Sequence, residues 1–313
     1  MQTVRDIFLL GLGFFLLIQS AKIFVNSSVN IAKRLKIPTM IIGLTIVAMG
    51  TSAPEVAISV SAAIRGQSDL AIANSVGSNL FNQLFIVGFS AMLFPIMVKM
   101  KVISRDFLVC ASATVLLLVM VIVWGDTMPR FVGFAFLALF AAYMIVLVRF
   151  ALKNKTEEPQ EEAELKPLWH SILFAVLGVA VIIGAGQITV TSAVNLATTI
   201  GISERIVGLT IVSIGTSLPE LVTTIIACRK KEGEFALGFI IGSSIFNILF
   251  VLGLAGAITP LTIAPGAVFD MAVLAVGTLA FFLFAKSSKK IVRIEGVALI
   301  VMYVGYMVWV VLG

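Results

Sequence analysis

The sequence predicts an all-α integral membrane protein with ten transmembrane helices, arranged as two inverted five-helix repeats, with both termini extracellular. The composition, the placement of basic residues and an internal repeat each support this prediction. Hydrophobic residues make up 60% of the 313 residues, charged residues make up 12%, and the mean hydropathy is +1.12. Soluble domains carry about 25% charged residues. We therefore expect a multi-pass protein of the cell membrane, with the lipid bilayer as its surroundings.

Ten apolar stretches are long enough to cross a bilayer as helices, which takes about 20 residues each. Their cores are 7–30, 38–64, 70–95, 106–124, 131–151, 169–198, 204–228, 235–259, 266–285 and 294–312.

Basic residues indicate the orientation of these helices. Of the 22 Lys and Arg residues, 17 fall in alternate connections, at 33–36, 99–105, 149–166, 229–231 and 286–293. Cytoplasmic loops retain basic residues, so these connections are predicted to lie inside and both termini outside. This asymmetry accounts for the net charge of +6 and gives no reason to expect nucleic-acid binding.

A 42-residue segment occurs twice. Ile41–Asn82 matches Ile206–Asn247 at 17 of 42 positions without a gap, at a constant offset of 165. We therefore predict a first repeat at 1–152, a polar cytoplasmic linker at 153–167 and a second repeat at 168–313. Five helices per repeat is an odd number, so the second repeat enters the membrane from the opposite side, as in many secondary transporters.

Each copy carries one carboxylate inside otherwise apolar sequence, Glu55 or Glu220. Ionisable residues at membrane depth are costly and usually functional. Pro54 and Pro219 precede them, and a proline inside a helix frees a carbonyl one turn earlier. Kinks and helix packing are the structural alternative, but two matched contexts favour a functional site.

Further oxygen donors share helix faces with these carboxylates or follow on the next helix. They are Thr51, Ser52, Ser78 and Asn82 in the first copy, and Thr216, Ser217, Ser243 and Asn247 in the second. An all-oxygen set suits hard cations such as calcium and sodium, and argues against zinc, copper or iron. A single histidine and two isolated cysteines give no pairing of nucleophile and base, so we do not expect an enzyme.

The motifs Gly50-Thr-Ser-Ala-Pro-Glu55 with Gly77-Ser-Asn-Leu-Phe-Asn82, and Gly215-Thr-Ser-Leu-Pro-Glu220 with Gly242-Ser-Ser-Ile-Phe-Asn247, resemble the two alpha-repeats of the calcium/cation antiporter superfamily. The resemblance is to the sodium/calcium exchanger branch and its prokaryotic members. It implies a ten-helix fold, four central ion sites, and first and sixth helices that slide across the rest.

The resemblance also implies ligand roles. Glu55 and Glu220 would bridge calcium and share in binding sodium, and the carbonyls of Thr51 and Thr216 would complete the calcium shell. Sodium would use the hydroxyls of Ser52, Ser78, Ser217 and Ser243 and the carbonyls of Ala48 and Ser213. Asn82 and Asn247 would line the middle.

Two features separate this chain from related branches. Relatives that also carry potassium have aspartate where Asn247 stands, so we expect potassium independence. The proton-coupled branch usually has Gly-Asn-x-x-Glu in place of Gly-Thr-Ser-x-Pro-Glu.

We therefore expect a secondary active antiporter that exchanges sodium for calcium by alternating access, electrogenically, with Ca²⁺ and Na⁺ as its transported ions. No cofactor, nucleic acid or obligatory protein partner is expected, and the chain is predicted to be a monomer. A calcium/proton antiporter using the same two glutamates is the main alternative, and a cation channel is a weaker one.

Overall fold

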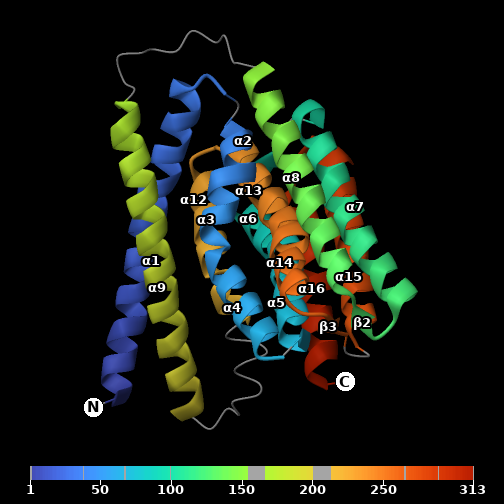
Figure 1. The fold of residues 1–313 in the computed structure, drawn as a ribbon. Coiled ribbons are helices and arrows are strands. Elements are labelled where there is room, and N and C mark those ends of the chain that lie inside the picture. Colours follow the sequence, from blue (N-terminus) through green and yellow to red (C-terminus); the bar gives the residue numbers. More distant parts are fainter. Residues whose placement is uncertain are drawn as a thin grey trace.

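The structure is a computed structural model that describes residues 2–37, 39–66, 68–98, 100–153, 166–199, 213–263, 266–287 and 289–312. It is almost entirely helical (Figure 1). The first half contains α1 (Gln2–Arg34), α2 (Thr39–Ile42), η1 (Gly43–Val47), α3 (Ala48–Thr51), α4 (Ala53–Ile64), α5 (Ser68–Leu80), η2 (Phe81–Ile86), α6 (Val87–Leu93), β1 (Ile96–Met97), α7 (Met100–Trp124), β2 (Thr127–Met128) and α8 (Arg130–Lys153). The second half contains α9 (Leu168–Thr199), α11 (Ser213–Thr216), α12 (Leu218–Arg229), α13 (Gly233–Ile245), η5 (Phe246–Leu252), α14 (Gly253–Ile258), β3 (Leu261–Thr262), α15 (Ala267–Ser287), β4 (Lys290–Ile291) and α16 (Arg293–Leu312).

Eight helices within the described ranges are long and apolar enough to cross a membrane. The helical stretches Met40–Thr51 and Ala53–Ile64 meet at a bend of 45°. Counted together as one broken span, they make a ninth. This bent pair corresponds to the second predicted span, 38–64. Most of the first half of the seventh predicted span, 204–228, lies outside the described residues.

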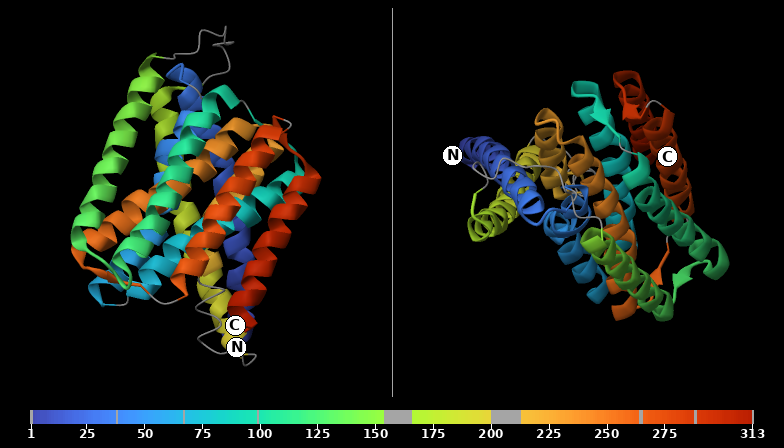
Figure 2. Two further views of the ribbon diagram at one scale, coloured as in Figure 1. Left: turned by 90° about the vertical axis from the view of Figure 1, so that its right-hand side faces the viewer. Right: turned by 90° about the horizontal axis from the view of Figure 1, so that it is seen from above.

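The two long helices α1 and α9 pack along each other in opposite directions and lie to one side of the remaining bundle (Figures 1 and 2). Small residues allow this contact. A Cβ atom on Gly13 would lie 2.3 Å from Thr189 Oγ1, and one on Gly178 would lie 3.0 Å from Phe24 Cβ. Helices without side-chain bulk at the contact can approach closely.

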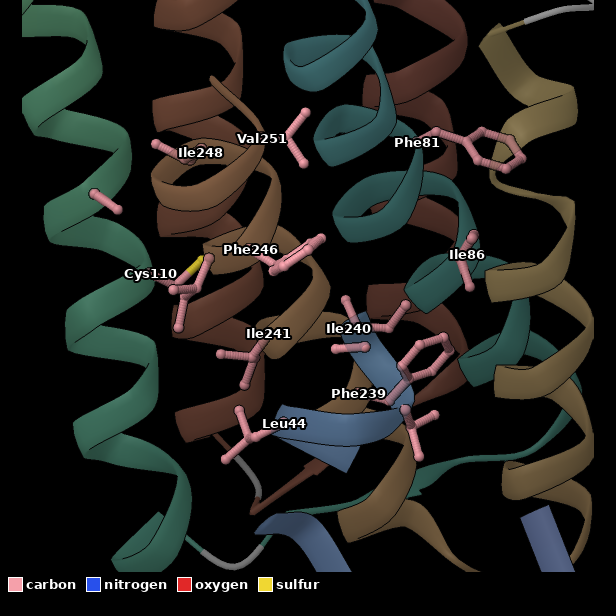
Figure 3. Close-up of a cluster of buried hydrophobic side chains, with 14 of the residues drawn as sticks. Leu44, Phe81, Ile86, Cys110, Phe239, Ile240, Ile241, Phe246, Ile248 and Val251 are labelled. Carbon is pink, nitrogen blue, oxygen red and sulfur yellow. The ribbon is translucent and has the colours of Figure 1, made fainter. Parts of the chain in front are cut away.

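Two continuous helical segments form the centre of the bundle. In the segment Gly233–Ile258, 94% of an 18-residue apolar stretch is buried inside the protein, and in Ser68–Leu93 the buried share is 72%. In each of the other spans the buried share of such a stretch is at most 39%. Side chains of α13 and η5, such as Ile240, Phe246 and Val251, belong to the apolar core of the bundle (Figure 3). The candidate ligands on these segments are therefore held by the most enclosed part of the protein.

The segment η1 crosses α13 with almost no space between their backbones. A Cβ atom on Gly43 would lie 2.7 Å from the Phe235 carbonyl oxygen, and one on Gly242 would lie 2.5 Å from that of Leu44. Neither position tolerates a side chain without movement of the backbone. This contact ties the helix that leads into α3 to the central segment of the other half.

Peripheral helices α7, α8, α15 and α16 complete the bundle, and two short ladders join their ends. β1 pairs antiparallel with β4, with Ile96 opposite Ile291, and β2 pairs antiparallel with β3, with Thr127 opposite Thr262. The sequence did not predict these two-residue strands. Each ladder joins the two halves.

Equivalent elements recur at the sequence offset of 165. α4, α5 and β1 begin and end 165 residues before α12, α13 and β3, and η2 begins 165 residues before η5. The segments η2 and η5, which are π-helical, directly follow the helices that carry Ser78 and Ser243. Single π-turns inside α-helices are frequent at functional sites.

Candidate functional site: a buried cluster of oxygen donors

The two glutamates occupy equivalent breaks in their helices. α3 ends at Thr51 and α4 begins at Ala53, while α11 ends at Thr216 and α12 begins at Leu218. The serine between each pair has turn-like dihedral angles, φ −82° and ψ 12° at Ser52 and φ −92° and ψ 9° at Ser217. Proline is tolerated in the first turn of a helix because its missing N–H has no partner there.

Glu55 and Glu220 therefore lie in the first turns of α4 and α12. The backbone N–H groups at a helix N-terminus favour negative charge nearby. Both residues are completely buried. Within the described residues, neither forms an ion pair with Lys or Arg. The helix breaks thus bring two uncompensated carboxylates into the interior.

Hydroxyl groups cross between the two halves. Ser217 Oγ donates to Glu55 Oε1 at 3.2 Å, and Ser52 Oγ donates to Glu220 Oε1 at 3.1 Å. Helix spacing had placed Ser52 on the same face as Glu55, and Ser217 on the same face as Glu220. In the structure each serine hydroxyl donates to the glutamate of the other half, and each serine lies at the turn between two helices.

The central helices add further donors to the same cluster. Ser78 Oγ of α5 lies 3.5 Å from Glu55 Oε1. Ser243 Oγ of α13 lies 2.8 Å from Ser52 Oγ and accepts from Asn82 Nδ2 at 3.3 Å. The structure therefore brings these predicted residues together in two hydrogen-bonded groups, one of Glu55, Ser217 and Ser78 and the other of Glu220, Ser52, Ser243 and Asn82.

Asn247 is hydrogen-bonded to a residue outside the predicted set. Its Nδ2 donates to Asn79 Oδ1 at 3.2 Å, and its side chain is completely buried. Asn247 lies in η5, at the position equivalent to Asn82 in η2.

The remaining residues of the predicted set, whose backbone carbonyls are the predicted ligands, lie next to the helix breaks. Thr51 is fully buried, and its hydroxyl donates to the Val47 carbonyl at 3.1 Å. The Ala48 carbonyl accepts from Ser52 N at 3.1 Å. Thr216 is buried at the end of α11, and Ser213 begins that helix. The Ser213 side chain lies outside the described residues.

Four buried oxygens of this cluster accept no hydrogen bond from any described residue. They are Glu55 Oε2, Glu220 Oε2, Asn82 Oδ1 and Asn247 Oδ1. An unsatisfied buried polar atom costs about 1–3 kcal/mol, and more if it is charged. These oxygens form two pairs at equivalent sequence positions. Carboxylate and amide oxygens are ligands for hard cations, so cations would satisfy these four atoms.

The cluster has a low density of charge. No group of three or more His, Cys, Asp or Glu that could hold a metal ion occurs in the part of the chain that the structure describes. The donor set is two carboxylates surrounded by neutral oxygens. Such a set can be neutralised by one divalent or two monovalent cations.

A cavity of about 180 Å³ borders the breaks. Pro54 of α4 and Pro219 of α12 line it together with Thr216 and with Gly186 and Gln187 of α9. The cavity therefore lies between α9 and the two helix breaks.

Comparison with known proteins identifies the type of protein that contains this cluster. The family model "Sodium/calcium exchanger protein" matches residues 6–149 and 170–312. The chain belongs to the sodium/calcium exchanger family. It is therefore a membrane transporter and not an enzyme.

Individual relatives are similar over almost their full length. CaxA from Alkalimonas amylolytica is 40% identical over 97% of each chain. The sodium/calcium exchanger MaX1 from Methanosarcina acetivorans is 32% identical over 98% of this chain and 99% of its own. The solved structure of the sodium-calcium exchanger NCX_Mj, soaked with Na⁺, is 29% identical with a TM-score of 0.85, over 98% of this chain and 99% of that one.

Sequence reasoning missed several buried polar residues of this exchanger. Asn74 Nδ2 donates to the Glu55 carbonyl at 3.2 Å and to Ser59 Oγ at 2.9 Å, which ties α5 to α4. Gln83 accepts from Thr278 at 2.7 Å. A helical spacing of four connects Ser75, Asn79 and Gln83, beside the stripe that holds Ser78 and Asn82. This pattern could have identified the second polar stripe.

Asp106 is another buried carboxylate. Its environment is different. The Arg105 guanidinium donates to both carboxylate oxygens of Asp106, at 2.9 Å and 3.1 Å, and Tyr143 Oη donates to Oδ1 at 3.2 Å. Asp106 is therefore compensated within the protein, whereas Glu55 and Glu220 need another source of positive charge.

Proposed function

We propose that this exchanger is a secondary active antiporter that couples sodium entry to calcium extrusion by alternating access, electrogenically and independently of potassium. The proposed ligands are Glu55, Glu220, Thr51, Thr216, Ser52, Ser217, Ser78, Ser243, Asn82, Asn247, Ala48 and Ser213. The observation that supports this proposal most directly is the set of four unsatisfied oxygens around two carboxylates without counter-ions. Sodium and calcium are also the ions named for MaX1 and NCX_Mj.

Charge explains why exchange is obligatory. With both glutamates ionised, the ion-free site carries a charge of −2, and even one unpaired charge at the bilayer centre costs about 3 kcal/mol or more. One calcium ion or two sodium ions would make the site neutral, and three sodium ions would make it +1. Reorientation is then restricted to ion-loaded forms. Moving one net charge is worth about 2.3 kcal/mol per 100 mV of membrane potential.

The proposed topology has ten transmembrane helices in two inverted repeats, at 1–152 and 168–313, joined by the cytoplasmic linker 153–167. Both termini would be extracellular. The equal element bounds at an offset of 165 and the opposite directions of α1 and α9 support this topology (Figure 1). An inverted repeat gives two interconvertible conformations, open to opposite sides.

Potassium independence follows from the amide at position 247. An aspartate there would add a third carboxylate to the site and leave its charge at −1 after one calcium ion is bound. With Asn247, calcium alone neutralises the two glutamates, so no additional monovalent cation is needed for the calcium-loaded form to reorient.

The test is calcium flux in proteoliposomes with the sodium and proton gradients imposed separately and the membrane potential clamped. We expect calcium uptake driven by an outward sodium gradient, unchanged by potassium and accelerated by an inside-positive potential. Calcium uptake driven by a pH gradient in sodium-free buffer would favour calcium/proton exchange instead. Currents far above carrier turnover would indicate a channel.

The exchanger is further proposed to act as a monomer in a prokaryotic cell membrane. Each protomer carries the complete cluster, because both halves of one chain supply it. Single-subunit proteoliposomes, prepared at high lipid-to-protein ratio, should retain full exchange per molecule.

A further inference from the structure

Asn79 lies one residue after Ser78 on α5 and is completely buried. Its Nδ2 donates to the backbone carbonyl of Ser244 on α13 at 3.1 Å, and its Oδ1 accepts from Asn247 Nδ2 at 3.2 Å. One side chain of the first half therefore contacts both the backbone and a proposed ligand of the second half.

The chemistry of these partners fixes which atom of each amide points where. A backbone carbonyl can only accept, so the nitrogen of Asn79 must face Ser244. The oxygen of Asn79 then faces Asn247, and because an amide oxygen can only accept, the nitrogen of Asn247 must face Asn79. The remaining Asn247 atom, Oδ1, is one of the four unsatisfied buried oxygens.

We propose that Asn79 is a positioning residue that holds the Asn247 amide with its oxygen, and not its nitrogen, toward the transported cation. This inference rests on the proposed function, because it assumes that Asn247 faces a cation during transport. A flipped amide would present two N–H hydrogens to a cation and would repel it.

The first-half amide has no equivalent constraint. At the position equivalent to Asn79 the second half has Ser244, whose hydroxyl has no hydrogen-bond partner among the described residues. Asn82 instead donates to Ser243 Oγ at 3.3 Å, and a hydroxyl can either donate or accept. The site therefore combines one amide of fixed orientation with one whose partner can adapt.

The experiment measures the calcium concentration for half-maximal sodium-driven uptake in proteoliposomes, together with the maximal rate. The variants are Asn79→Ala, Asn247→Ala, the double variant, and Ser244→Ala as the matched control at the equivalent position. We expect Asn79→Ala to raise the half-maximal calcium concentration about fivefold, which is the effect of losing one typical hydrogen bond. Ser244→Ala should leave it unchanged, because the backbone carbonyl that Asn79 uses is retained.

The double variant separates positioning from simple packing. If Asn79 acts through Asn247, the double variant should have the same half-maximal concentration as Asn247→Ala alone. An unchanged concentration in Asn79→Ala, or effects of the two substitutions that multiply, would overturn the proposal. If Asn79→Ala does not fold, Asn79→Ser replaces it, since serine is the residue at the equivalent position.

Glu55→Gln in the same assay keeps the two proposals distinguishable. Abolished flux in Glu55→Gln together with normal calcium dependence in Asn79→Ala would overturn only the role of Asn79. Retained flux in Glu55→Gln would overturn the proposed ion site itself.

Discussion

Ser52 and Ser217 each donate to the glutamate of the opposite half, at 3.1 Å and 3.2 Å. The two halves of the site therefore depend on each other at the level of single side chains. A residue that belongs by sequence to one repeat acts on the carboxylate of the other.

This crossed pairing predicts a specific pattern of energetic coupling. Ser52→Ala should weaken calcium binding about fivefold, because one hydrogen bond to Glu220 is lost. In double-mutant cycles measured by titration calorimetry, Ser52→Ala should couple to Glu220→Asp by about 0.5 kcal/mol or more. Its coupling to Glu55→Asp should be close to zero, and a larger coupling to Glu55 than to Glu220 would refute the crossed arrangement.

Protons should compete with the transported cations for the two carboxylates. Protonation of a glutamate removes a coordinating oxygen and also neutralises the charge that attracts calcium. Lowering the pH should therefore raise the calcium concentration needed for half-maximal exchange. The measurement is sodium-driven calcium uptake at a series of pH values without a pH gradient. Exchange that becomes more effective on acidification would contradict a site built on ionised glutamates.

At the scale of elements, the contact between η1 and α13 positions the first helix break against the central segment. A Cβ atom on Gly242 would lie 2.5 Å from the Leu44 carbonyl oxygen. We therefore expect Gly242→Ala to destabilise the protein by about 1–3 kcal/mol, as overpacking does.

Thermal unfolding in detergent measures this effect, and Gly305→Ala is the matched control. A Cβ atom on Gly305, in α16, would have no heavy atom within 4 Å. That variant should unfold at the wild-type temperature or slightly above it. Equal unfolding temperatures for the two variants would show that the contact between η1 and α13 is not tight.

The pair of α1 and α9 is the element proposed to slide across the bundle. Lys230, directly after α12, donates to Asn26 of α1, which places the moving helix beside the fixed part at this point. Cross-linking Asn26→Cys to Lys230→Cys with a short thiol reagent should stop calcium flux while leaving calcium binding intact. Each single variant treated with the same reagent should keep its flux, and full flux after cross-linking would exclude sliding at this contact.

At the scale of the whole molecule, the repeat in the sequence predicted much of the architecture. The offset of 165 that aligns Glu55 with Glu220 also relates the bounds of α4 and α12, and of α5 and α13. The apolar composition, together with the two carboxylates that interrupt apolar sequence, indicated where the cluster lies. Membership of the exchanger family agrees with the resemblance of the paired motifs.

Other features could not be predicted from spacing. The direction of Ser52 depends on the dihedral angles at a helix break, and periodicity assumes that the helix continues. Asn79 escaped a comparison of the repeats because its counterpart is Ser244, so the position is not duplicated. Asp106 follows Arg105 in the sequence, and its burial beside Tyr143 of α8 depends on how the helices pack.

The central claim is that two buried negative charges prevent reorientation until transported cations neutralise them. The direct measurement is sodium-driven calcium flux through the double variant Glu55→Gln and Glu220→Gln in proteoliposomes, with thermal unfolding as the control for folding. We expect a folded protein whose sodium-coupled calcium flux is lost, by about a hundredfold or more, because both charged ligands are gone. A folded double variant that exchanges sodium for calcium at the wild-type rate would contradict the account.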